Sequence, residues 1–169
     1  MQEPLENMPE LAESERIIVS TRLFRAPRRM VYEAFADPKQ VVLWWGPNGF
    51  TTTIVEMDLR PGGKWKLIMH GPDGTNYPNE MTFTQVVPAE RVEADLVGGK
   101  EGAEPIHMHR TITWEDEDGG TRLTLRHEFA SRELRDENVR TYKAVEGGRQ
   151  LFERLAAHLA NVEASREKA

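Results

Sequence analysis

The sequence predicts an α+β fold in which a curved antiparallel sheet of about seven strands grips a long C-terminal helix, with two short helices after the first strand. Residues 50–129 are almost entirely of β type with short turns between strands, which favours an antiparallel meander over parallel strands joined by crossovers. The residues after 130 are helical and carry one apolar stripe. A sheet with one apolar face needs a cover, and only this helix is long enough to supply it.

Length and composition restrict the class of protein. A chain of 169 residues, 38% of them hydrophobic, suits one globular domain. The net charge of −6 argues against a nucleic-acid partner, because phosphate binding needs concentrated positive charge. The absence of cysteine excludes disulfides, thiolate metal sites and cysteine nucleophiles. No apolar run reaches the ~20 residues of a membrane span, and the N-terminus lacks the pattern of a secretory signal. We therefore expect a cytoplasmic protein without membrane insertion.

The chain is expected to begin with a tail and a strand. Residues 1–15 contain five glutamates and no basic residue, which predicts a mobile acidic tail ahead of a single domain over residues 16–165. A half-buried strand is then indicated by a period of two. The alternating residues on which this prediction depends are Ile17, Val19, Thr21 and Leu23.

Two short helices follow this strand. Pro27 suits the first turn of a helix, where its missing N–H costs nothing, and Asp37-Pro38 ends that helix. The second helix is expected over residues 39–45 and closes on the turn at residues 46–49.

Six further strands and a C-terminal helix complete the fold. The strands are expected at Thr51–Leu59, Lys64–His70, Glu80–Val87, Arg91–Val97, Ile106–Glu115 and Thr121–Phe129. Ser131 is a suitable N-cap, and everything beyond it is expected to form one long helix. Its apolar stripe consists of Val145, Gly148, Phe152, Leu155, Leu159 and Val162.

The order and spacing of several short motifs resemble a known superfamily. The motifs are Phe24-x-Ala26-Pro27, Val31-x3-Phe35, Asp37-Pro38, Trp44-Trp45-Gly46-Pro47, Asp58-x-Arg60-Pro61-Gly62-Gly63-x-Trp65, Met69, Gly74, Pro88-x-Glu90-Arg91 and Phe152-Glu153-Arg154-Leu155. Together they resemble the SRPBCC superfamily, and within it a bacterial branch similar to the activator of the ninety-kilodalton heat-shock protein's ATPase. The resemblance implies the START-like, helix-grip fold. The superfamily includes carriers of lipids and other hydrophobic ligands, polyketide cyclases and co-chaperone domains, so the fold alone does not select among these functions.

Gly147-Gly148 departs from this pattern, because relatives of the branch often carry Gly-Trp at the corresponding place. Gly148 falls on the apolar stripe of the helix. Loss of an indole from the face that meets the sheet is expected to leave space there. The residues expected opposite Gly148 are drawn from Trp65, Met81, Phe83 and Trp114.

Large apolar side chains are candidates for the wall of a ligand cavity. Trp65 and Met69 alternate onto one face of a strand, as Met81 and Phe83 do on the next, and methionine suits walls that adapt to varied ligands. Ordinary filling of the core is the alternative for each tryptophan. The full set of ligand-binding candidates is Trp44, Trp65, Met69, Met81, Phe83, Gln85, Arg110, Trp114, His127, Gly148 and Phe152.

Three polar candidates alternate onto the same strand face as apolar residues that are expected to point inward. These are Gln85, Arg110 and His127. A buried polar side chain needs a partner, and a few convergent polar groups in an apolar pocket orient a ligand. A bulge or a strand end that turns the residue to solvent is the alternative.

No motif assigns a metal, a cofactor or a catalytic residue. His107 and His109 share one face of a strand, but two ligands do not complete a site, and their parity directs them away from the core. His158 is expected on the surface. No nucleophile–base spacing, glycine-rich phosphate loop or His-Glu-x-x-His sequence is present.

Three functions are compatible with these features. The leading hypothesis is binding of a small, largely apolar molecule between the sheet and the C-terminal helix. The second is a cyclase- or hydrolase-like enzyme that uses Arg110 or His127 as an electrostatic or acid–base group in the same cavity. The third is a co-chaperone that regulates a chaperone ATPase through its surface, which would need an exposed apolar patch. A homodimer is compatible with all three.

Overall fold

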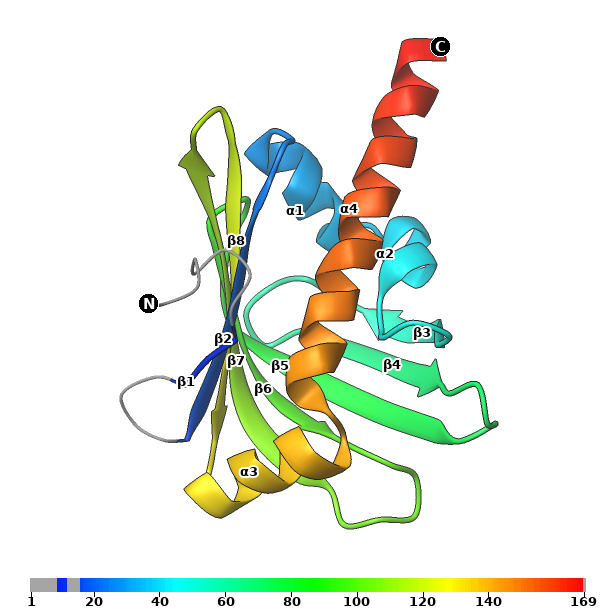
Figure 1. Cartoon of the computed structure of the whole chain (residues 1–169), viewed down its shortest axis with the longest axis vertical. Coiled ribbons are helices and arrows are strands. Elements are labelled where there is room, and N and C mark those ends of the chain that lie inside the picture. The colour runs from blue at the N-terminus through cyan, green and yellow to red at the C-terminus, as the bar shows by residue number, and fades with distance from the viewer. Residues whose placement is uncertain (1–8, 12–15, 169) are drawn as a thin grey trace.

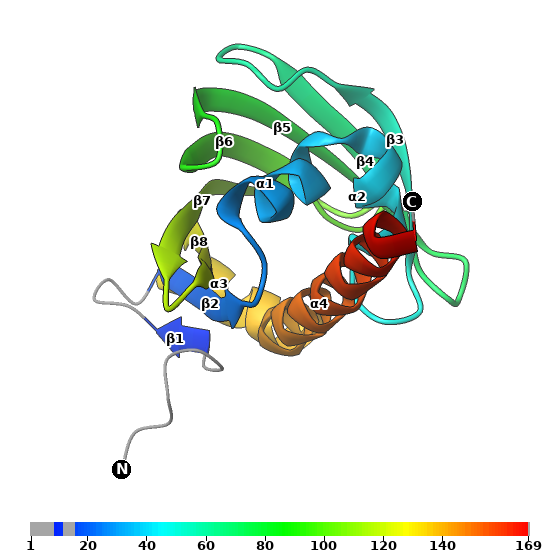
Figure 2. The same cartoon turned by 90° about the horizontal axis from the view of Figure 1, so that it is seen from above.

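An eight-stranded antiparallel sheet curves around helix α4, as Figures 1 and 2 show. The computed structural model describes residues 9–11 and 16–168. In sheet order the strands are β1 (Pro9–Leu11), β2 (Ile17–Phe24), β8 (Gly120–Phe129), β7 (Ile106–Glu117), β6 (Arg91–Gly98), β5 (Asn76–Val87), β4 (Lys64–His70) and β3 (Thr51–Met57). The helices are α1 (Arg28–Ala36), α2 (Pro38–Trp44), α3 (Arg132–Thr141) and α4 (Ala144–Lys168). The predicted α+β fold is confirmed, with β1 as one additional short strand.

The first long strand pairs with the last. Strands β3 to β8 follow one another in the sheet, whereas β2 pairs with β8, with Ile18 opposite His127. The side of β2 that faces the helices carries Ile18, Ser20 and Phe24. The sequence prediction rested on the other alternating set, Ile17, Val19, Thr21 and Leu23. It was right about the strand but wrong about which of its two faces points to the helices. Ile17 and Ile18 are both apolar, and a period of two does not by itself say which of two adjacent apolar residues points inward.

Part of the expected tail belongs to the sheet. Pro9–Leu11 pairs antiparallel with β2, with Pro9 opposite Ser20 and Leu11 opposite Ile18. This pairing covers backbone groups of β2 that an open sheet edge would leave unpaired. Residues 1–8 and 12–15, the rest of the segment expected to be mobile, lie outside the described residues.

The C-terminal helical segment is two helices, not the single helix that was predicted. The hydroxyl of Ser131 accepts a hydrogen bond from the Leu134 N–H at 3.2 Å, so the predicted N-cap is confirmed. Lys143, between α3 and α4, has a left-handed backbone with φ of 50°. A left-handed residue interrupts a right-handed helix, so the chain turns here and α4 rises across the sheet from Ala144 (Figure 1).

Helix α4 and the two short helices close the interior. Phe152 meets Phe24 edge-on at 5.7 Å between ring centroids, and Leu155 is completely buried. His158 was expected on the surface, but it is only 8% exposed and its Nε2 lies 2.9 Å from Oε1 of Gln40. It is buried because α2 packs against this side of α4. No helix in the described part of the chain is both long and apolar enough to cross a membrane.

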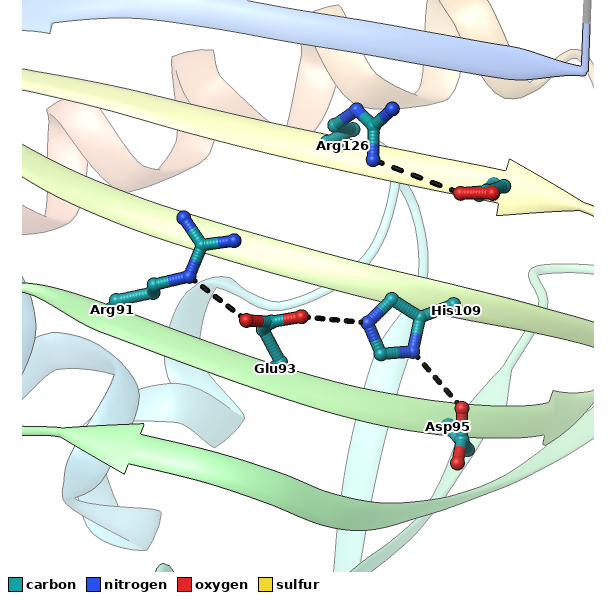
Figure 3. A network of polar contacts seen from close by, with 6 residues as sticks. Arg91, Glu93, Asp95, His109 and Arg126 are labelled. Carbon is teal, nitrogen blue, oxygen red and sulfur yellow. Dashed lines mark hydrogen bonds and ion pairs between the residues drawn. The ribbon is translucent and has the colours of Figure 1, made fainter. Parts of the chain in front are cut away.

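The outer face of the sheet carries a charged network (Figure 3). His109 lies 2.9 Å from a carboxylate oxygen of Glu93 and 2.9 Å from one of Asp95, and Arg91 bonds the second oxygen of Glu93. Partial burial alone lowers the pKa of His109, but the hydrogen bonds to Asp95 and Glu93 outweigh it and raise the pKa above its ordinary value. His107 is exposed, so the outward direction predicted for both histidines is confirmed. Among the side chains described within residues 16–166, no group of three or more acidic or histidine residues is arranged to hold a metal ion.

Candidate ligand-binding site

A cavity of about 210 Å³ lies between the concave face of the sheet and the first turns of α4. A water molecule needs ~10–15 Å³ on this measure, so the cavity has room for on the order of 15 water-sized positions. Most of its wall is apolar, and a few polar side chains interrupt it. The apolar side chains are Ile18, Trp45, Leu67, Met69, Met81, Leu96, Ile106, Met108, Leu125, Phe129 and Leu151.

Strand alternation explains which residues reach this cavity. Successive side chains of a strand point to opposite faces, so Met108 and Arg110 on β7 face the cavity together, and Leu125 and His127 do so on β8. The register of β7 against β8 places Arg110 directly opposite His127. Two polar side chains thereby become neighbours on the sheet side of an otherwise apolar space.

Arg110 is held by neutral groups on three sides. Its Nε donates a hydrogen bond to Nε2 of His127 at 2.8 Å, and one N–H of Nη1 points to the thioether sulfur of Met81 at 3.4 Å. The guanidinium carbon lies 5.3 Å from the ring centroid of Trp45, within the range of a cation–π contact. These contacts fix the position of the guanidinium, but none of them supplies a negative charge.

Burial shifts the titration of both members of this pair. Burial lowers the pKa of Arg110 to about 10, so the guanidinium remains charged at neutral pH. Burial, assisted by the charge of Arg110, lowers the pKa of His127 well below its usual range. His127 is therefore neutral at pH 7, with the lone pair of Nε2 accepting from Arg110 and the ring proton on Nδ1.

Gly147 and Gly148 form part of the helix side of the cavity. They lie in the first turns of α4, and position 148 faces β2. A Cβ at position 148 would lie 3.1 Å from Oγ of Ser20, and one at position 147 would meet only Cγ of Pro47 at 3.6 Å. The residues expected opposite Gly148 were the Trp65, Met81, Phe83 and Trp114 set, and of these only Met81 lines the same cavity. The difference arises because α4 crosses β2 rather than the centre of the sheet at this turn.

A second, smaller cavity of about 20 Å³ lies deeper in the core, next to α1. Three of the predicted site residues line it and not the main cavity: Trp65, Phe83 and Trp114. Its volume is enough for about one water molecule. The indole N–H groups of Trp65 and Trp114 are buried and have no hydrogen-bond partner among the described residues. Met81 and Arg110 line both cavities, so the guanidinium lies between them.

Three of the predicted site residues line neither cavity. Trp44 is completely buried in the core, where its indole N–H donates to the carbonyl of Ala34 at 3.0 Å, and Phe152 packs on Phe24. The inward assignment of Gln85 was wrong, since this side chain is exposed. A β-bulge at residue 84 shifts the register between Phe83 and Gln85, which reverses the alternation from there on. The predicted candidates on the main cavity are thus Met69, Met81, Arg110, His127 and Gly148.

Sequence reasoning missed several lining residues. Trp45, not its neighbour Trp44, faces the cavity, and Arg154 holds this turn by donating from Nη1 to the carbonyls of residues 45–47 at 2.9–3.1 Å. The Trp-Trp-Gly-Pro motif was a signal for this segment, but it does not say which indole turns inward. Other polar lining residues missed are Ser20, Tyr77, Asn79, Asn138 and Tyr142.

The cavity opens at one end of the sheet. The lining residues that keep partial exposure include Tyr77 at the start of β5, Ile106 at the start of β7 and Tyr142 at the α3–α4 junction. The antiparallel register brings the starts of β5 and β7 and the end of β8 to the same end of the sheet. The rings of Tyr77 and Tyr142 meet edge-on at 6.5 Å between centroids, so two tyrosines from distant segments flank this opening.

The family model described as "Activator of Hsp90 ATPase homolog 1-like protein" matches residues 25–160. The chain belongs to this family. The resemblance inferred from the motifs is thereby confirmed, and as a member of the Activator of Hsp90 ATPase homolog 1-like family the chain has the expected fold. A search of curated proteins found no match.

Several solved structures share this fold. Protein Ms6760 from Mycobacterium smegmatis is 30% identical with a TM-score of 0.77, and the match covers 88% of this chain and 93% of that one. A protein from Arthrobacter aurescens is 26% identical with a TM-score of 0.79, over 95% and 90% of the two chains. The AHSA1 (SPO3351) protein from Silicibacter pomeroyi, at 24% identity and a TM-score of 0.69 over 85% and 97%, shares the fold.

Proposed function

We propose that the protein binds a small, largely apolar molecule in the cavity between the sheet and α4. The observation that carries the proposal is an opening into about 210 Å³ of mostly apolar space at the centre of the fold. Protein interiors are normally packed without such voids, and an unfilled apolar cavity costs stability because its walls lack contacts. A concave, apolar site with a few convergent polar groups is the usual form of a small-molecule site.

The paired polar side chains Arg110 and His127 are the observation that favours the second candidate, a cyclase- or hydrolase-like enzyme. In such an enzyme the guanidinium would stabilise a developing negative charge, and the imidazole would move a proton. However, the lone pair of His127 Nε2 is occupied by Arg110 at 2.8 Å, and no carboxylate lines the described part of the cavity to orient the ring as a base. The geometry therefore supports binding better than turnover.

The co-chaperone alternative has no comparable feature in the described part of the chain. The large apolar side chains that are exposed in the described part of the chain are Leu43, Val55 and Val97, which come from three different elements. This distribution favours the cavity over the surface as the site of action.

The proposal is tested with N-phenyl-1-naphthylamine, a neutral dye whose fluorescence rises in apolar surroundings. We expect saturable binding of about one dye per chain, and native mass spectrometry of the freshly purified protein is expected to show a co-purified apolar molecule. Gly148→Trp, which places an indole on the wall of the cavity, is expected to weaken dye binding. Ala160→Trp, on the exposed side of the same helix, is the matched control and should leave it unchanged. Absence of saturable binding, or equal binding by both variants, would contradict the proposal.

A further inference from the structure

Arg110 is the one charged side chain among the described residues that line the cavity. Its neighbours are a neutral imidazole, a thioether and an indole face, and it makes no ion pair with any side chain described within residues 16–166. By contrast, Arg91 on the neighbouring strand bonds Glu93 at 2.9 Å. The cavity therefore contains a cation that the protein itself does not neutralise.

Arg110 is partly buried, so its guanidinium gives up part of its hydration, and no negative charge nearby offsets that loss. The guanidinium nevertheless stays charged at neutral pH, because burial lowers its pKa only to about 10. Burial and the charge of Arg110 lower the pKa of His127, so the imidazole stays neutral. The lone pair of its Nε2 accepts the hydrogen bond from the Nε–H of Arg110. His127 thus positions the guanidinium, and the cost of the charge is left for a ligand to offset.

The guanidinium has donors left for such a ligand. Nε is bonded to His127 and one N–H of Nη1 points to Met81, so the second N–H of Nη1 and both N–H groups of Nη2 have no partner among the described residues. These are the donors of the end-on fork with which arginine binds the two oxygens of a carboxylate.

Resting on the proposed function, we infer that the ligand is an apolar monocarboxylic acid whose carboxylate pairs with Arg110 while its apolar body fills the cavity. A carboxylate fits better than a phosphate monoester, because the described lining offers one positive charge and no second cation for a dianion. The apolar body lies against the methionine and leucine walls, and the polar end lies at the sheet side of the cavity.

The test compares two probes of equal chain length, decanoate and 1-decanol, as competitors of N-phenyl-1-naphthylamine at pH 7.5. A neutral apolar cavity would prefer decanol, because the ionised acid is better hydrated and gains less by leaving water. We expect the reverse: at least about tenfold stronger competition by decanoate, as for a charge-assisted hydrogen bond. Arg110→Met should remove this preference and leave the affinity for decanol within about threefold. Arg126→Met, on the outer face of β8, changes the net charge equally and should keep the preference.

The outcomes separate this inference from the proposed function. Decanol competing as well as decanoate in the parent, or a decanoate preference that survives Arg110→Met, would overturn the monocarboxylate and leave apolar binding in place. Failure of the dye and of both competitors to bind would overturn both. Arg110→Lys covers the case in which the methionine variant does not fold: it keeps the charge without the fork, so a weaker decanoate preference is expected, and its complete loss would overturn the inference.

Discussion

Gly148→Trp tests whether the space beside the first turns of α4 is open. A Cβ at this position lies 3.1 Å from Oγ of Ser20 and 3.9 Å from its Cβ. The first distance is tight, but a serine hydroxyl can rotate away, and the second is an ordinary contact. Helical side chains lean toward the N-terminus of their helix. The indole is therefore directed toward Ala144 and Tyr142, which line the same cavity.

The expected change in stability is the difference between a gain and a cost. The change from glycine to tryptophan within a helix improves helix propensity by about 0.5 kcal/mol. Burying 150–250 Å² of indole at ~25 cal/mol per Å² gives an upper bound of about 4–6 kcal/mol, reduced because the cavity is open at one end. Displacing Ser20 and fixing the side chain cost roughly 1–3 kcal/mol. We expect the free energy of unfolding to be unchanged or raised by up to ~2 kcal/mol, which corresponds to a Tm up to about 4–8 °C higher.

Urea denaturation and dye titration measure the two consequences together. Gly147→Ala is the matched control for helix propensity alone, because its Cβ meets only Pro47 at 3.6 Å. A loss of more than ~1 kcal/mol that persists when Ser20→Ala is added would refute the reasoning, since the space would then be absent even without the serine hydroxyl. A stable tryptophan variant that still binds the dye at full affinity would place the apolar site elsewhere.

Three further predictions concern other parts of the structure. Arg154→Met removes the hydrogen bonds to the carbonyls of residues 45–47 and should lower the free energy of unfolding by about 2–3 kcal/mol and speed hydrogen exchange in this turn; unchanged exchange would contradict it. Trp44→Phe leaves the carbonyl of Ala34 unpaired in the core and should cost about 2–4 kcal/mol in urea denaturation, whereas a cost below ~1 kcal/mol would show that the bond contributes little. The pKa of His109 is raised in the folded state, so its stabilisation is complete below the unfolded pKa of ~6.5 and is lost as pH rises through the folded pKa. His109→Gln should therefore cost up to ~1 kcal/mol at pH 6 and less at pH 8.5, and an equal cost at both would refute the assignment.

The sequence predicted the residues of the candidate site correctly where side-chain alternation along a strand alone sets the direction of the side chain. Met69, Met81, Arg110 and His127 lie on the cavity because no bulge falls in the part of each strand that carries them. Gln85 does not, because the bulge before it depends on pairing with β6 and leaves no mark in the local pattern.

The helices show the same distinction. The N-cap at Ser131 is a local interaction and was found in the sequence. The break at Lys143 was not, since no proline or glycine marks it in the sequence, and only the structure shows the left-handed backbone between α3 and α4, which contact each other. His158 looked like a surface residue until α2 was placed against it.

By itself the sequence determined the fold class, the succession of the long strands along the chain and the membership of the family, because these follow from periodicity, turn residues and motif spacing. Only the tertiary structure decided that Arg110 and His127, 17 positions apart, are hydrogen-bonded, that Gly148 faces Ser20 and that Trp45 rather than Trp44 meets the cavity. Those pairings depend on strand register and on how helices dock. Both are set by contacts between residues far apart in the chain, which no local pattern contains.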